Sequence, residues 1–245
     1  MNKLLIANWK MNPETLREAV RLARAEDLSG VVVAPPFVYL ESAGKALRNA
    51  HLGAQDVSLS EPRAVTGEIS PVMLKNLGVK FVIVGHSERR ALGETDEMIN
   101  KKVIAALKAG LKVVLCVGEP SRPMTRTKNY VKNQLEKDLA GLLKLKAKSS
   151  KLIIAYEPVW AIGTGTPDNP KTAAEMISYI KKLLKAKSLK LKAVKVLYGG
   201  SVTAKNSAGF FKRPEIDGAL VGGASLNAKE FRKIWGNCFI KYGRV

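Results

Sequence analysis

The sequence predicts an α/β protein built as a closed (β/α)8 barrel, and three observations carry this prediction. Short runs of Val, Ile, Leu and Ala alternate with segments of helical periodicity along all 245 residues. The apolar runs are mostly continuous, as in parallel strands that are covered on both faces. Eight such runs follow one another without a linker or a low-complexity stretch, so we expect one barrel domain over residues 1–245.

The expected strands are residues 4–9, 31–34, 51–56, 81–85, 112–117, 151–156, 193–198 and 217–221. Between them, segments such as ETLREAVRLARAE and DEMINKKVIAALKAG place apolar residues at helical spacing, and the second ends at Gly110, a typical stop signal. A doubly wound open sheet is the alternative, but it normally carries a Gly-rich fingerprint after its first strand. The first strand here ends in ANWKMN, which favours the barrel.

The chain has a formal net charge of +20, which needs an explanation. Such an excess is compatible with binding to nucleic acid or to an anionic surface. It is also compatible with a lysine-rich solvated surface. The lysines are spread over several segments and are not interleaved with aromatic residues, as binding of single strands would require. We therefore expect a solvated surface and no nucleic-acid partner, with a positive field that speeds the arrival of an anionic substrate.

Targeting and metal-binding signals are missing from the sequence. No run of about 18 apolar residues predicts a membrane span, and the first apolar run is too short for a secretory signal. The two cysteines, Cys116 and Cys238, have no metal-ligand spacing and predict no disulfide framework. These features favour a cytoplasmic protein. Neither a metal site nor a cofactor motif is expected.

A barrel places its chemistry where strands end and loops begin. The first strand ends with Asn8 and Lys10, whose side chains we expect on the same side because strands alternate with period two. The fourth strand ends in VGHSERR, where Gly85 allows a turn, His86 projects and Ser87 is a good N-cap. A helix start beside an imidazole disfavours its charged form, so we expect a neutral His86. Taken singly, Lys10 could equally be a rim ion pair, and a lone histidine such as His86 is more often structural.

The sixth strand ends in Glu157, which is followed by PVWAIGTGTPDNP. A carboxylate at an apolar strand end is a usable general base, although a rim carboxylate paired with Lys10 or an Arg is the alternative. The glycines Gly163 and Gly165 and the flanking prolines predict a short lid. The seventh and eighth strands end in YGGSV and LVGGASL, two Gly pairs that suit a bound phosphate group. Together these features predict proton transfer on a small phosphorylated molecule by side chains alone.

The motifs ANWKMN, VGHSERR, CVGE, AYEPVWAIGTG, YGGSV and LVGGASL occur in the order and spacing of the triosephosphate isomerase family, which the whole chain resembles. The resemblance implies a TIM barrel of glycolysis and gluconeogenesis that interconverts dihydroxyacetone phosphate and D-glyceraldehyde 3-phosphate through an enediolate, without a cofactor. A glutamate base with a neutral histidine electrophile is the established pairing in this family, so that pairing is taken from the resemblance.

The resemblance also implies a role for each site residue. Glu157 is the expected base and His86 the electrophile, while Glu88 has a positioning role. Lys10 and Asn8 stabilise the enediolate charge. The substrate-binding residues that the resemblance implies are Asn8, Lys10, Gly163, Ser201, Leu220, Gly222 and Gly223, with Ile162 and Leu220 forming an apolar clamp over the base.

The same resemblance implies a homodimer in which the loop around Thr66 reaches the neighbouring subunit's site. Two departures from the family pattern fall on this contact. Arg63 and Val65 replace the usual Gly and aromatic residue, and the segment after Arg90 is shortened. Replacing an aromatic by Val removes much of a large buried contact, so we expect a weakened or reshaped dimer.

Other functions remain open at this point. One is a basic nucleic-acid-binding protein on a barrel scaffold, and another is a different sugar-phosphate enzyme of the same fold, since fold alone does not decide function. A third is a folded isomerase that is poorly active because its subunit interface is loose. The joint presence of Lys10, His86, Glu157 and the lid sequence favours the isomerase.

Overall fold

The protein folds as a closed barrel of parallel strands in the order β1 to β8, with β8 pairing back to β1. The structure is a computed structural model that describes residues 3–59, 64–121, 124–142, 151–163, 167–186 and 194–241. The strands are β1 (Leu4–Asn8), β2 (Val31–Ala34), β3 (His51–Ala54), β4 (Phe81–Val84), β5 (Lys112–Val117), β6 (Leu152–Tyr156), β7 (Lys195–Tyr198) and β8 (Gly218–Val221). The predicted α/β barrel is confirmed, and the strand ends differ from the predicted ones by one or two residues.

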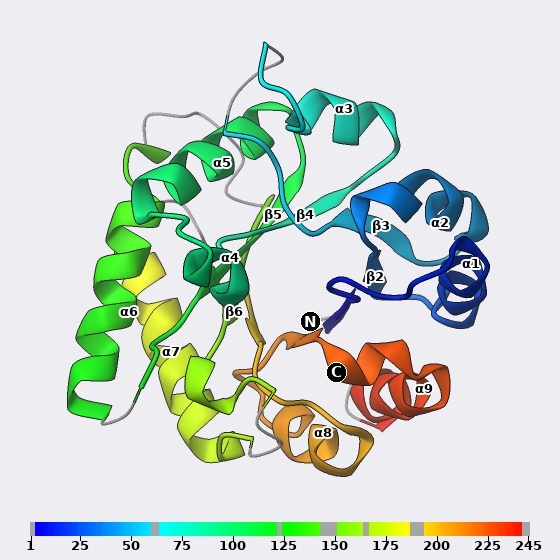
Figure 1. The fold of residues 1–245 in the computed structure, drawn as a ribbon. Helices are drawn as coiled ribbons and strands as arrows, with labels where there is room; N and C mark the ends of the chain where they lie inside the picture. Colours follow the sequence, from blue (N-terminus) through cyan, green and yellow to red (C-terminus); the bar gives the residue numbers. More distant parts are fainter. Residues whose placement is uncertain are drawn as a thin grey trace.

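Helices alternate with the strands and surround them as an outer ring (Figure 1). They are α1 (Leu16–Ala25), α2 (Leu40–Ala46), α3 (Pro71–Asn76), α4 (Ser87–Ala91), α5 (Asp96–Lys108), α6 (Met124–Asp138), α7 (Pro170–Ala186), α8 (Ala204–Phe211) and α9 (Ala228–Gly236). Short helical turns are η1 (Phe37–Tyr39), η4 (Val159–Ala161), η5 (Gly223–Leu226) and the π-turn η6 (Asn237–Lys241). Among the described residues, no helix is long and apolar enough to cross a membrane.

Local sequence signals account for the helix ends. Thr15 and Thr95 cap α1 and α5, each accepting a hydrogen bond from a backbone N–H three residues later. Gly110 follows α5 with a φ of 85°, the left-handed conformation that a glycine takes up without steric cost. The predicted stop at this glycine is therefore confirmed.

Two apolar layers explain why the strands are almost wholly apolar. The smaller layer fills the barrel and includes Leu4, Ile6, Phe81, Ile83, Cys116 and Leu220. The larger layer, which includes Leu5 and Ala7, packs between the strands and the helices. Neighbouring residues of β1 thus alternate between the two layers, and Asn8 continues the inward series at the end where the site forms.

Trp9 anchors the end of β1 through a buried carboxyl group. Its indole Nε1 donates a 2.7 Å hydrogen bond to Oε2 of Glu26, which follows α1. Glu26 is fully buried, and its Oε1 has no hydrogen-bond partner in the described part of the chain. Burial raises the pKa of Glu26 to about 8, against a smaller lowering by the bond from Trp9. The carboxyl is therefore protonated at neutral pH.

This proton makes stability depend on pH. Between the ordinary pKa of 4.5 and about 8 the folded state holds a proton that the unfolded state releases, so the free energy of unfolding falls as pH rises. Glu26→Gln keeps the acceptor for Trp9 and removes this linkage. We expect wild type to lose about 3 kcal/mol relative to the variant between pH 5 and pH 8, as measured by urea unfolding. Parallel pH curves for the two proteins would contradict the assignment.

Candidate active site

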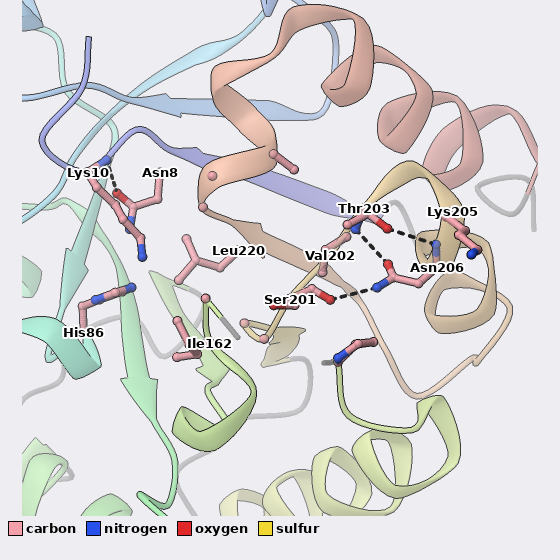
Figure 2. A pocket seen from close by; sticks show the side chains of 17 residues that line it. Asn8, Lys10, His86, Ile162, Ser201, Val202, Thr203, Lys205, Asn206 and Leu220 are labelled. Atoms are coloured by element: carbon pink, nitrogen blue, oxygen red, sulfur yellow. Dashed lines mark hydrogen bonds between the residues drawn. The ribbon is translucent and has the colours of Figure 1, made fainter. Parts of the chain in front are cut away.

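A cavity of about 620 Å³ opens among the residues that follow β1, β4, β6, β7 and β8. All of the predicted site residues line it except Glu157 and Glu88. In Figure 2, Asn8, Lys10 and His86 lie at one side, Thr203 and Asn206 lie at the other, and Leu220 lies between them. Among the described lining residues the charged side chains are Lys10 and Lys205, so the cavity suits an anion.

Lys10 lies at the cavity because the chain turns sharply there. Its φ is 54°, a left-handed conformation that is rare for a residue with a side chain. Its backbone N–H donates to Oδ1 of Asn8 at 3.1 Å, and its Nζ pairs with Oε1 of Glu88. Asn8 and Lys10 do lie on one side, as expected, but β1 ends at Asn8, so strand alternation is not the reason. The turn itself brings the ammonium group to the cavity.

Gln55, just after β3, holds this turn. Its Nε2 donates to the carbonyl oxygens of Lys10 and Ala34, at 2.8 and 2.9 Å. Both bonds oppose relaxation of the backbone at Lys10. Gln55→Met keeps the length of the side chain and removes both donors, so we expect kcat/KM to fall about tenfold, with most of the loss in kcat. Steady-state kinetics would check this, and an unchanged kcat would show that the turn holds without Gln55.

His86 caps α4, whereas the sequence suggested Ser87 as the cap. Gly85 makes the predicted turn, with a φ of 71°, and leads the imidazole over the helix start. The backbone N–H of Glu88 donates to Nδ1 of His86 at 3.2 Å. This contact uses Nδ1 as an acceptor, so Nε2 is the ring nitrogen that can donate a hydrogen bond. The neutral state of His86 stays a prediction from the sequence.

Glu157 lies beside the cavity, behind His86. Its Oε1 is 3.2 Å from Nε2 of His86, and its Oε2 accepts a 2.9 Å hydrogen bond from the backbone N–H of Ser87. The residue is 1% exposed and does not line the cavity. Its Oε1 is buried without a well-formed hydrogen bond to the described residues, which leaves this position incompletely satisfied.

The lid meets the loop after β7 at the other side of the cavity. The backbone N–H of Ser201 donates to the carbonyl oxygen of Ala161, at 3.3 Å, and Ile162 and Gly163 line the cavity next to it. The predicted lid glycine Gly165 falls at 164–166, outside the described residues. Gly222 admits the Lys10 side chain, because a Cβ there would lie 3.1 Å from Cε of Lys10.

The chain resembles triosephosphate isomerases over nearly its whole length. A family model described as triosephosphate isomerase matches residues 3–238. The chain is 46% identical to the triosephosphate isomerase of Caldanaerobacter subterraneus subsp. tengcongensis, over 94% of this chain and 97% of that protein. It is 43% identical to that of Finegoldia magna, over the full length of both chains, and 41% identical to that of Aquifex aeolicus, over 96% and 98%.

The chain belongs to the triosephosphate isomerase family. The predicted resemblance is thereby confirmed.

Sequence reasoning missed that two glycines make room for Glu157, and it assigned one of them, Gly199, to a phosphate-binding pair. A Cβ on Gly118 would lie 1.6 Å from the carbonyl oxygen of Glu157, and one on Gly199 would lie 2.9 Å from its Cγ. Gly118 belongs to the family motif CVGE, but nothing in the sequence shows which backbone segment passes close to it. A glycine directly after an apolar strand was the available signal, since it often marks a close approach of another backbone.

Sequence reasoning also missed the start of α8. Thr203 accepts from the backbone N–H of Asn206, and the Asn206 side chain accepts from Thr203 in return, a capping box. Both residues line the cavity, as does Lys205 between them. The Thr–x–x–Asn spacing was the signal for this helix start. Its consequence for the site is a cation beside the loops that carry the two Gly pairs.

Proposed function

We propose that Glu157 and His86 isomerise a triose phosphate held in this cavity. The chain is an aldose–ketose isomerase of the triosephosphate isomerase family, and its reaction interconverts dihydroxyacetone phosphate and D-glyceraldehyde 3-phosphate. The observation that carries the assignment of residues is the 3.2 Å approach of Glu157 to His86 beside a cavity whose described charged side chains are cations. A base, a neutral donor and an anion-binding wall are what this reaction needs.

In this proposal Glu157 takes the proton from the carbon next to the carbonyl and returns it to the neighbouring carbon. The N–H at Nε2 of His86 donates to the oxygen on which charge develops, and the ammonium of Lys10 stabilises the same charge. Glu88 positions Lys10 through their ion pair. Asn8 lies beside them and orients the substrate oxygens.

Glu157 must leave the Ser87 N–H before it reaches the substrate. The position seen here satisfies one carboxylate oxygen well and leaves Oε1 without a well-formed hydrogen bond. An unsatisfied buried oxygen makes this position less stable than a fully bonded one. The carboxylate can therefore rotate into the cavity at moderate cost once a substrate offers it a new partner.

The substrate phosphate binds at the opposite side of the cavity in this proposal. Backbone N–H groups of Gly163, Ser201, Gly222 and Gly223 hold it, and Lys205 adds a positive charge. The Ser201 N–H is bonded to Ala161 of the lid here, so it becomes available only when the lid shifts. Phosphate binding and lid movement are therefore linked through one hydrogen bond, and the moved lid brings Ile162 toward Leu220 and excludes water.

Isomerisation in D2O tests the proposal. A carboxylate base exchanges the abstracted proton with solvent, so dihydroxyacetone phosphate formed from glyceraldehyde 3-phosphate should carry one deuterium at C1. A hydride shift between the carbons would leave it unlabelled. Proton NMR of the product, with a protein-free sample as control, distinguishes the two results. Absence of turnover, or turnover without label, would contradict the proposed chemistry.

We also propose that the chain acts as a homodimer through the loop around Thr66. Thr66 is exposed, and so are the apolar side chains of Met11, Val65 and Leu92, which are 92%, 45% and 77% exposed. A contiguous patch of such groups would favour a subunit contact. Val65 stands where the family has an aromatic residue. We therefore expect the dimer to dissociate at a higher protein concentration than a dimer with the aromatic contact would. Arg63, the other expected departure, lies outside the described residues.

Sedimentation over a dilution series tests the dimer. We expect a monomer–dimer equilibrium within the micromolar range, and isomerase activity per milligram that rises with protein concentration. Val65→Tyr should shift the equilibrium toward the dimer. A dimer that persists at nanomolar concentrations would contradict the expected weakening.

A further inference from the structure

A second cavity lies outside the active site, between β6, α6 and α7. It has a volume of about 210 Å³ and shares no lining residue with the active-site cavity. Helices α6 and α7 run side by side in the outer ring (Figure 1). Trp160, in the turn η4 that begins the lid, forms part of its wall. The cavity thus lies directly behind the lid.

An incompletely bonded carboxylate faces this cavity. Glu119 lines it and is 3% exposed. Its Oε1 accepts hydrogen bonds from the Tyr156 hydroxyl at 3.0 Å and from Nε1 of Trp160 at 2.8 Å. Its Oε2 is buried with no hydrogen-bond partner among the described residues. A buried carboxylate oxygen without a donor is costly, and a ligand that supplies a donor would remove that cost.

The wall of the cavity carries an excess of negative charge. Glu119, Asp168 and Glu175 line it, and the one lysine of the described wall, Lys128, places its Nζ 5.5 Å from the centre of the Tyr179 ring. Burial raises the pKa of Glu119, and the charge of Asp168 raises it further, against lowering by the bonds from Trp160 and Tyr156. The charge of Asp168 therefore disfavours a charged Glu119, and a cation close to both carboxyl groups would offset this effect.

We propose that this cavity binds a small organic cation, a protonated amine or an alkylguanidinium, that donates an N–H to Oε2 of Glu119. The space is smaller than a cavity for a drug-sized ligand, so the cation carries only a short apolar tail. Buried Met176 and the rings of Tyr156 and Trp160 offer apolar surface for that tail. Among the described residues, no three His, Cys, Asp or Glu side chains are grouped so that they could hold a metal ion.

Binding there would act on the lid. Glu119 holds the indole of Trp160, and the next residue, Ala161, holds the Ser201 N–H. A cation bonded to the same carboxylate stabilises the position of Trp160 seen here, so the lid moves less readily. The expected effect is a lower kcat without competition for substrate. This effect on turnover rests on the proposed function, whereas the binding itself does not.

Titration with n-propylguanidinium tests the binding. The indole N–H resonance of Trp160, assigned with Trp160→Phe, should shift saturably, and n-propylurea, of similar shape without charge, should leave it unchanged. Glu119→Gln keeps an acceptor for Tyr156 and Trp160 and replaces Oε2 by a donor. We expect it to weaken binding about 30-fold or more. Glu41→Gln, an equal charge change on an exposed side chain of α2, should bind as wild type does.

A second wall variant and kinetics with the probe also test the site. Glu175→Gln changes an exposed part of the wall and leaves Glu119 intact. It should weaken binding only a few-fold, and it tests the site even if Glu119→Gln does not fold. Kinetics with the probe should show a lowered kcat at saturating substrate. No saturable shift, an equal shift with n-propylurea, unchanged affinity in both wall variants, or competition with substrate would each overturn the site. If the wild-type protein shows no isomerase activity even when no probe is added, that result would instead count against the proposed function.

Discussion

Replacing Glu157 by Gln is expected to lower kcat about a thousandfold while the fold remains intact. A positioned general base contributes roughly 10² to 10⁴ to a rate, and Gln cannot accept the substrate proton. The amide oxygen can still accept the hydrogen bond that the Ser87 N–H donates in the structure. Its side chain fills the same buried space, so the change removes the basic group and little else.

A coupled assay in both directions would measure this loss, with thermal unfolding as a check on folding. Glu41→Gln is the matched control, because it removes the same charge from a side chain on α2 that is remote from the cavity. KM should change little, since the proposed phosphate contacts come from other residues. A variant that retains a tenth or more of wild-type turnover would show that another group is the base.

Gly118→Ala is expected to destabilise the barrel by about 3 kcal/mol or more and to abolish activity. A Cβ at this position would lie 1.6 Å from the carbonyl oxygen and 2.4 Å from the carbonyl carbon of Glu157. These are backbone atoms, so no flexible side chain can move aside. The ends of β5 and β6 would have to separate, although the Glu157 N–H donates to the Val117 carbonyl oxygen at 2.8 Å.

Thermal unfolding would show this as a fall in Tm of about 6–12 °C for a chain of this length. Gly236→Ala is the control, because a Cβ at that position in α9 meets nothing within 4 Å. Alanine is the better helix former, so the control should unfold at the same temperature as wild type or slightly higher. Equal unfolding temperatures for wild type and Gly118→Ala would show that the β5–β6 junction can open without cost.

The sequence predicted the barrel because its evidence is local and repeated. Each apolar strand run ends close to where the structure ends it, and caps such as Thr15 and Thr95 lie where side-chain chemistry requires them. The positions of Asn8 and His86 follow from the same logic, since one is the last residue of a barrel strand and the other lies two residues beyond a strand end. These predictions hold because strand period, turn glycines and capping act over a few residues.

The sequence by itself determined the fold, the family and the chemical groups that gather at the ends of the strands. Only the tertiary structure decided how those groups are held. Packing of distant segments turns Lys10 through Gln55 and places Glu157 on the Ser87 N–H, outside the cavity. It also leaves Oε2 of Glu119, behind the lid, without a hydrogen-bond partner among the described residues. Such features depend on contacts between residues far apart in the chain, which local pattern does not encode.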